Sequence, residues 1–175
     1  MSLNIHSISP SKVIRGESAW KESLESITEL CTRPLIIGRS SSTKRLRNSF
    51  KNDLLLKGLH TLSFELDHDC CELDIKNACQ FSKKNNCDGI IAAGGGKVLD
   101  AGKLIADLLS INCITVPLSA STCAGWTALS NIYTSDGKYI KDVSLKRCPN
   151  LLIFDHKIVR AAPPRTLASG MADAV

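Results

Sequence analysis

The sequence predicts an α/β fold, with a parallel sheet flanked by helices and a small β-hairpin. Short apolar runs that suit buried strands alternate with segments of helical periodicity. Such alternation favours a parallel sheet covered on both faces. Ser135-Asp136-Gly137 joins two further strand-like runs, as in a hairpin turn. The 175 residues are enough for one hydrophobic core.

The spacing of apolar residues predicts each element in turn. Apolar residues three or four positions apart indicate helices over 18–30, 42–56, 72–84 and 97–109. Strand patterns cover 34–38, 61–66, 87–93, 113–116 and 151–154, while 129–134 and 138–143 flank the hairpin turn. A last helix begins after Pro163-Pro164, because proline suits the first helical turn.

Three consecutive glycines, Gly94 to Gly96, form the most informative turn of the chain. They lie between an apolar run and a helical segment that begins at Lys97. Without Cβ atoms, a ligand can approach the backbone closely, and the N–H groups of a first helical turn favour an anion. The turn therefore predicts a diphosphate cradle in a Rossmann-like fold. Its spacing is neither G-x-G-x-x-G nor that of the phosphate loop of nucleotide triphosphatases.

Composition favours a protein that binds small anionic ligands. The net charge is +5, and the one basic cluster, Lys44, Arg45 and Arg47, reads as a solvated helix face rather than a nucleic-acid surface. No apolar run approaches the ~20 residues of a membrane span. The N-terminus lacks a signal-peptide pattern, and the eight cysteines form no C-x-x-C pair. We therefore expect a cytoplasmic protein with reduced thiols and neither membrane nor nucleic-acid partners.

Four motifs in order carry a family resemblance. They are Gly94-Gly-Gly-Lys97-x-x-Asp100-x-x-Lys103, Thr115-Val-Pro117-x-x-Ala120-Ser121-Thr122, Ala128-Leu-Ser-x-Ile-Tyr133 and Ala162-Pro163-Pro164-Arg165-x-Leu167-Ala168-x-Gly170-Met-x-Asp173-Ala174. In these the chain resembles the iron-containing (group III) alcohol dehydrogenases, and most of all their glycerol dehydrogenase branch. The resemblance implies a nucleotide-binding α/β domain over 1–162. Residues 163–175 would begin a helical metal-binding domain, the rest of which this chain lacks.

The resemblance also implies roles for single residues. The cofactor-binding positions would be Gly94, Gly95, Gly96, Lys97, Asp100, Leu118, Ser121, Thr127, Leu129 and Tyr133. Packing alone is an alternative role for Leu129. Asp173 matches a metal ligand for zinc or ferrous iron, which two histidines of the helical domain would complete. Without the resemblance, Asp173 would be interpreted as a solvated helix residue, because a single carboxylate does not make a metal-binding motif.

Two positions depart from the family pattern. Arg39 stands where NAD-specific members carry an acid, so a group that repels a 2′-phosphate becomes one that attracts it. We therefore expect NADP to be bound at least as well as NAD. Ser42 or Thr43 reads equally as an N-cap of the following helix. Cys123 replaces the substrate-binding Asp of glycerol dehydrogenases, and a thiol is a poor partner for polyol hydroxyls.

The expected function is a metal-dependent oxidoreductase that interconverts a small alcohol or polyol and a carbonyl compound with NAD(P). The resemblance implies a divalent metal, zinc or Fe(II), and we expect a homo-oligomer when the protein is full-length. One alternative is a glycerol-phosphate dehydrogenase, in which Lys141, Lys146 and Arg147 would neutralise the substrate phosphate. Another is a catalytically silent nucleotide-binding or sensor module.

Overall fold

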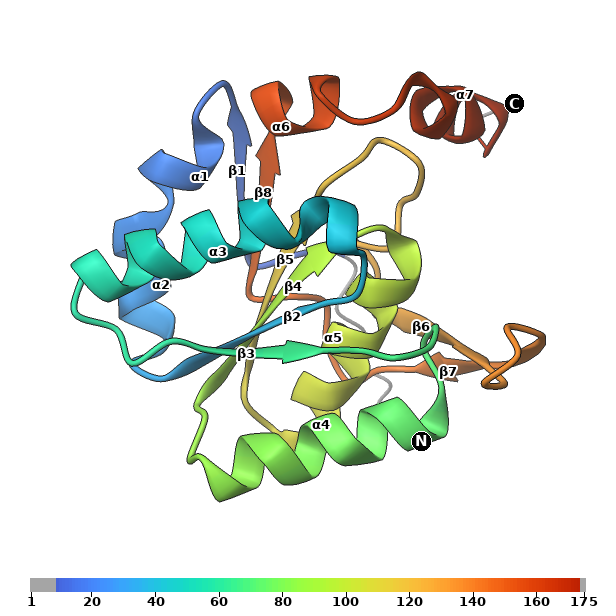
Figure 1. Cartoon of the computed structure of the whole chain (residues 1–175), viewed down its shortest axis with the longest axis horizontal. Helices are drawn as coiled ribbons and strands as arrows, with labels where there is room; N and C mark the ends of the chain where they lie inside the picture. Colours follow the sequence, from blue (N-terminus) through green and yellow to red (C-terminus); the bar gives the residue numbers. More distant parts are fainter. Residues whose placement is uncertain (1–8, 174–175) are drawn as a thin grey trace, which may run out of the picture.

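The computed structural model describes residues 9–173 and contains a six-stranded parallel sheet, as the alternating pattern predicts (Figure 1). The strand order is β1-β8-β5-β4-β2-β3. The strands are β1 (Lys12–Gly16), β2 (Pro34–Gly38), β3 (Leu62–Glu65), β4 (Gly89–Gly94), β5 (Asn112–Pro117) and β8 (Leu151–Asp155). Strands β6 (Leu129–Tyr133) and β7 (Tyr139–Ser144) form the expected antiparallel hairpin beside this sheet.

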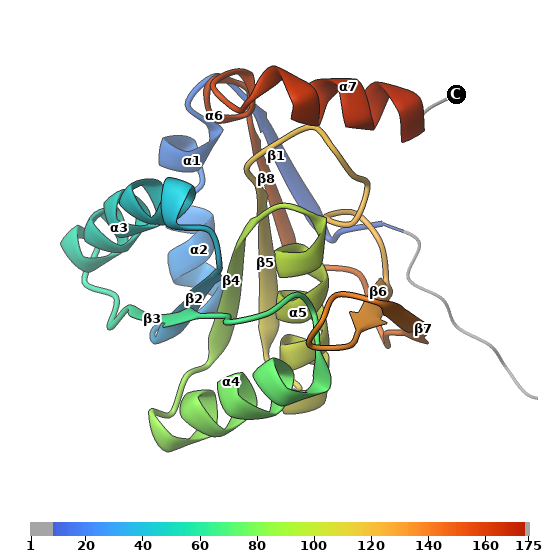
Figure 2. The same cartoon turned by 45° about the vertical axis from the view of Figure 1, so that its right-hand side comes forward.

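Helices cover both faces of the sheet (Figure 2). They are α1 (Ala19–Glu22), α2 (Leu24–Leu30), α3 (Ser41–Leu56), α4 (Glu72–Lys84), α5 (Gly96–Leu109), α6 (His156–Arg160) and α7 (Pro164–Asp173). Within the described part of the chain, none of them is long and apolar enough to cross a membrane.

The core consists of two layers, one on each face of the sheet. In β2, Ile36 packs with Phe50 and Leu54 of α3, while Leu35 and Ile37 face the layer that contains α4, α5 and Ile132 of the hairpin. All three β2 side chains are at most 1% exposed. Successive residues of a strand point to opposite faces, so a continuous apolar run is what a sheet covered on both sides requires.

The expected helix over 18–30 is wrong in one respect: it is broken at Ser23 into α1 and α2. The Ser23 hydroxyl is buried and donates to the Trp20 carbonyl oxygen at 2.7 Å. A serine that bonds to nearby backbone competes with continued helix. The apolar periodicity survives the break because both short helices pack on the same layer, through Trp20 and Ile27.

The sequence patterns do not predict two elements, strand β1 and helix α6. Strand β1 lies at the edge of the sheet, paired only with β8, and its side chains are mostly exposed, so it shows no apolar run. Helix α6 is five residues long, too short for a periodicity. Its signal is Asp155, whose carboxylate accepts the N–H groups of Lys157 and Ile158 and caps the helix.

The strand order creates a crevice between β2 and β4. Helix α3 follows β2 and leads outward to β3, whereas α5 follows β4 and leads in the other direction to β5. The two helices pack on opposite faces of the sheet. Ligands of such sheets bind beyond the carboxyl ends of the strands at this point of reversal. Here those ends are Gly38 and Gly94.

Candidate functional site

A cavity of about 770 Å³ opens at this crevice. Three loops build it, each following a strand at the carboxyl edge of the sheet. They follow β2, β3 and β4, and the lining residues are Arg39, Ser40, Ser41, Thr43, Lys44, Arg47, Glu65, Leu66, Asp67, His68, Asp69, Ala93, Gly94, Gly95, Gly96, Lys97 and Val98. The structure thus brings Arg39 together with the glycine turn, although they are far apart in the sequence.

The three glycines have different surroundings. A Cβ on Gly94 would lie 2.7 Å from the Val98 Cβ, and one on Gly96 would lie 3.2 Å from the Thr122 side chain. A Cβ on Gly95 would meet nothing within 4 Å. Gly95 is the N-cap residue of α5, and no side chain caps the helix. The space beside the Gly95 backbone at the uncapped start of α5 is therefore open, as an anion site requires.

The turn between β2 and α3 presents a second uncapped helix start. Ser40 occupies the N-cap position, but no side chain accepts from the helix amides. The alternative that Ser42 or Thr43 caps the helix is wrong, because both lie within its first turn. The Thr43 hydroxyl donates to the Ser40 carbonyl oxygen at 3.1 Å. Two helix N-termini, those of α3 and α5, thus border one cavity.

Arg47 differs from its neighbours in the basic cluster. Lys44 and Arg45 are exposed, as a solvated helix face predicts, but Arg47 is only 3% exposed. Its guanidinium donates to the Ser40 carbonyl oxygen at 3.1 Å and to the Glu65 carboxylate at 2.5 Å. It crosses β2 over Gly38, where a Cβ would overlap its side chain. Arg47 therefore ties the β2–α3 turn to the end of β3.

Asp69 joins the two cations that sequence predicts for phosphate binding. Its carboxylate forms ion pairs with Arg39 through one oxygen and with Lys97 through the other. The Lys97 ammonium also lies 4.5 Å from the centre of the Tyr133 ring, within the range of a cation–π contact. Sequence reasoning missed Asp69. Its one signal is that it follows β3 closely, at the ligand-binding edge of the sheet.

Asp100 and Lys103 form a buried ion pair on α5, 3.0 Å apart. The Lys103 ammonium also donates to the Thr127 carbonyl and hydroxyl and to the Leu129 carbonyl, and the Asp100 carboxylate accepts the Asn131 N–H. Burial raises the pKa of Asp100, and the contact with Lys103 opposes that rise. The structure therefore places Asp100, Thr127 and Leu129 in a network that holds the hairpin against α5.

A second cavity, of about 640 Å³, borders the glycine turn at Gly95. Gly95 and Thr43 line both cavities, and Leu118 lines only the second. Neither cavity is lined by Ser121, Thr127, Leu129 or Tyr133. The Ser121 hydroxyl is hydrogen-bonded to that of Ser119 at 2.9 Å, and Cys123 is an exposed thiol in the following turn.

The last helix crosses the loop that follows β5. A Cβ on Gly170 would overlap the Ala120 carbonyl oxygen, so α7 depends on glycine there to approach this loop. Leu167 and Met171 are 55% and 64% exposed. Asp173 is the last residue of α7, and its side chain lies outside the part that the structure describes.

A parallel sheet with two uncapped helix starts at its point of reversal defines an α/β protein of the class whose ligands bind at that edge of the sheet. The model of the iron-containing alcohol dehydrogenases matches residues 10–156, and the chain belongs to this family. An uncharacterized oxidoreductase of Synechocystis is 37% identical over 96% of this chain and 43% of its own. Glycerol dehydrogenase of Escherichia coli is 31% identical over 95% of this chain and 46% of its own.

Solved structures agree with the family assignment. The crystal structure of glycerol dehydrogenase from Schizosaccharomyces pombe has a TM-score of 0.86 and 26% identity, and it covers 99% of this chain. The match extends over 44% of that structure's chain. This chain thus spans about half the length of the relatives that it matches.

Proposed function

We propose that the chain is the nucleotide-binding domain of a metal-dependent alcohol dehydrogenase that uses NAD(P). The observation that carries the proposal is the open position at Gly95, between two cavities and at an uncapped helix start. A dinucleotide is two nucleosides joined by a diphosphate, so a cradle that borders two cavities suits its shape and charge. Family membership adds the reaction class.

In this proposal each group has a role that its position supports. The α5 amides and Lys97 would bind the diphosphate, and Arg39 would approach the adenosine ribose. Family resemblance assigns the nicotinamide half to the side that carries Leu118, Ser121 and Tyr133, with Thr127 and Leu129 held in place by Lys103. The bound nicotinamide would accept or supply hydride, and the protein would position it.

The proposed metal, zinc or Fe(II), would polarise the substrate oxygen as a Lewis acid. Asp173 is the residue of this chain that family resemblance offers as its ligand. The substrate would be a small alcohol or carbonyl compound. Cys123 makes glycerol a poor candidate, since a thiol cannot replace a carboxylate as a partner for hydroxyl groups.

The glycerol-phosphate alternative is supported by a relative of this chain, but not by the three basic residues that were expected to bind the phosphate. Lys141 lies beside Glu72, with 3.7 Å between the charged atoms. The Lys146 N–H bonds to Asp107 and the Arg147 guanidinium to the Ile111 carbonyl, near the C-terminal end of α5. A helix of 14 residues is about 20 Å long, so Lys146 and Arg147 lie far from the glycine turn at its other end.

Three further parts of the proposal concern the whole protein. The exposed leucine and methionine of α7 suit the start of a second domain, with the boundary at residues 162 and 163. The cysteines among the described residues are in the reduced form, without disulfides, which suits the cytoplasm. We also infer a homo-oligomer for the full-length protein, which light scattering would test.

Calorimetric titration of the 175-residue chain with NADH and NADPH tests the domain's role. We expect one site per chain, with NADPH bound at least as tightly as NADH. Turnover of alcohols by the full-length protein, with and without zinc or ferrous iron, tests the reaction. Absence of dinucleotide binding by a folded chain overturns the first statement. Binding without any metal-dependent turnover favours the silent module.

A further inference from the structure

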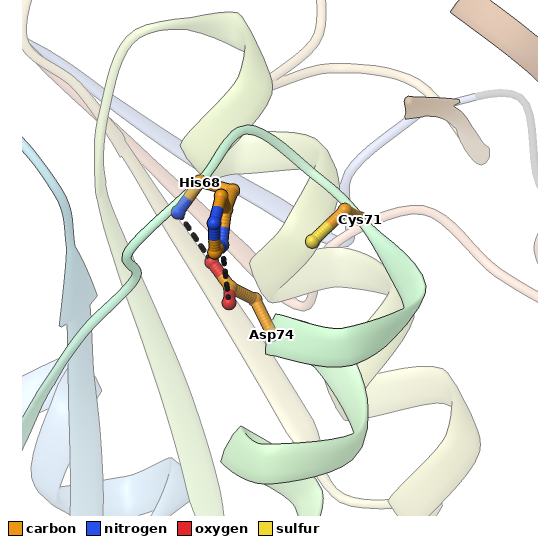
Figure 3. A group of neighbouring side chains, drawn as sticks. All are labelled: His68, Cys71 and Asp74. Atoms are coloured by element: carbon orange, nitrogen blue, oxygen red, sulfur yellow. Dashed lines mark hydrogen bonds and ion pairs between the residues drawn. The ribbon is translucent and has the colours of Figure 1, made fainter. Parts of the chain in front are cut away.

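We propose that His68, Cys71 and Asp74 form a binding site for a divalent metal ion of the zinc class. The three lie where the loop after β3 enters α4 (Figure 3). Their candidate ligand atoms all lie within 4.8 Å of one another. The set provides a ring nitrogen, a sulfur and a carboxylate oxygen, and Asp173 is not part of it.

The geometry is close to that of a tetrahedral site. Metal–ligand bonds of about 2.0 to 2.3 Å place neighbouring ligand atoms roughly 3.3 to 3.6 Å apart. The His68 Nδ1 and the Asp74 Oδ1 are 3.2 Å apart, which already fits. The Cys71 side chain points toward this pair in Figure 3. Because the three ligand atoms lie within 4.8 Å of one another, the Cys71 sulfur needs to move by only about 1 Å to occupy a third vertex of the tetrahedron.

Asp74 is oriented by a bond that a metal would not disturb. Its Oδ2 accepts the His68 backbone N–H at 2.7 Å, while its Oδ1 faces the imidazole. Metal binding would replace only the contact between Oδ1 and the ring: the neutral imidazole would carry its proton on Nε2, and the proton of the Cys71 thiol would be released to solvent. Carboxylates that bind metals are commonly held by a second hydrogen bond of this kind.

Burial favours the site over a casual surface contact. Asp74 and Cys71 are 2% and 3% exposed, so they need no large movement to become shielded ligands. The His68 side chain is 35% exposed, which leaves a path for the ion and room for a water as fourth ligand. Thiolate and imidazole together select zinc and similar ions over magnesium or calcium, which prefer oxygen ligands.

The competing explanation is purely structural. Asp74 and Cys71 lie in and before the first turn of α4, where a carboxylate that accepts a loop N–H stabilises the helix start. That role accounts for the Asp74 Oδ2 contact with the His68 N–H. It requires neither a thiol at Cys71 nor an imidazole at His68, so those two residues distinguish the explanations.

The test uses the 175-residue chain freed of metal by a chelator and titrated with Zn²⁺ against a chromophoric competitor. We expect one ion per chain. Substitution with Co²⁺ should give a near-ultraviolet charge-transfer band, which requires a thiolate ligand. Cys71→Ser and His68→Gln should each lower the Zn²⁺ affinity at least tenfold, and Cys71→Ser should remove the band. Loss of a metal ligand has effects at least as large as loss of the groups that orient it.

Matched variants make the result decisive. Serine is a good N-cap residue, so Cys71→Ser should fold as well as the unmodified chain. Cys79→Ser removes a thiol further along the same helix, and Asp173→Asn removes the carboxylate that family resemblance assigns to another metal; neither should change affinity. Absence of stoichiometric Zn²⁺, or equal affinity in Cys71→Ser and Cys79→Ser, overturns the site. Neither outcome depends on dinucleotide binding.

Discussion

The Asp69 carboxylate is ion-paired with the Lys97 ammonium beside the glycine turn. Its second oxygen is paired with Arg39. The only carboxylate among the described residues that contacts both cations therefore occupies the place where we propose that phosphate groups bind. A diphosphate has to displace this carboxylate or share its cations.

Replacing Asp69 with Asn should raise dinucleotide affinity severalfold, because two partly exposed ion pairs of about 0.2 to 1 kcal/mol each no longer compete with the ligand. The gain should shrink as salt is added. Calorimetry at two ionic strengths measures both effects. Asp67→Asn is the matched control, since Asp67 lines the same cavity but forms no ion pair with residues 9–173. A loss of affinity in Asp69→Asn would instead make Asp69 a direct ligand of the cofactor.

Replacing Arg39 with Asp should shift preference from NADPH toward NADH. A hydrogen bond between charged groups contributes about 1.5 to 3 kcal/mol, which is roughly tenfold to a hundredfold in affinity. The Arg39 side chain is 44% exposed and its guanidinium is paired with Asp69, so the lower end of this range applies. The ratio of the two dissociation constants is the quantity to measure. Arg45→Asp makes the same charge change on an exposed residue of α3 and should leave that ratio alone.

Replacing Gly95 with Val should abolish dinucleotide binding while the domain stays folded. The backbone of Gly95, with φ −81° and ψ −178°, is open to any residue, and its Cβ meets no atom within 4 Å. The added methyl groups would fill the cradle, and the poorer N-cap would cost about 1 kcal/mol of stability. Gly95→Ala should give an intermediate affinity. An unfolding midpoint close to that of the unmodified chain, together with unchanged affinity, would show that the cradle is elsewhere.

Replacing Lys103 with Met should destabilise the domain by about 3 to 5 kcal/mol, because it leaves the Asp100 carboxylate buried without its partner. Urea unfolding measures the change. Lys84→Met removes an exposed lysine from α4 and should cost less than about 0.5 kcal/mol. Changing Asp100 to Asn as well should recover part of the loss, since no charge then remains buried.

The loss of stability caused by Lys103→Met should also depend on pH. Burial raises the pKa of Asp100 above the value of about 3.9 expected in the unfolded chain. A carboxyl group with a raised pKa in the folded state favours folding below its unfolded pKa, and this contribution is lost as pH rises through the folded pKa. The Lys103→Met difference from the unmodified chain should therefore be smaller near pH 4 than at pH 7. A difference that is constant between pH 4 and pH 7 would contradict the prediction, because the loss of Lys103 would then not alter proton binding by Asp100.

Local patterns in the sequence were enough to predict most of the fold. The buried strand over 34–38 and the helix over 72–84 have the bounds that periodicity predicts. The glycine turn was equally readable, because a strand, three residues without Cβ atoms and a helix start are adjacent in the chain. Each of these inferences depends on neighbours within a few positions, where backbone preferences and side-chain periodicity act directly.

The contacts between distant segments were decided by the tertiary structure alone. The burial of Arg47 depends on Gly38 and Glu65, the pairing of Asp69 depends on strands β2 and β4 lying side by side, and Lys146 and Arg147 lie at the wrong end of α5 for a phosphate. Periodicity shows which face of a strand is buried but not which strand lies beside it. Strand order is set by how the helices pack over the whole sheet, so the residues that meet at the crevice follow from the complete fold.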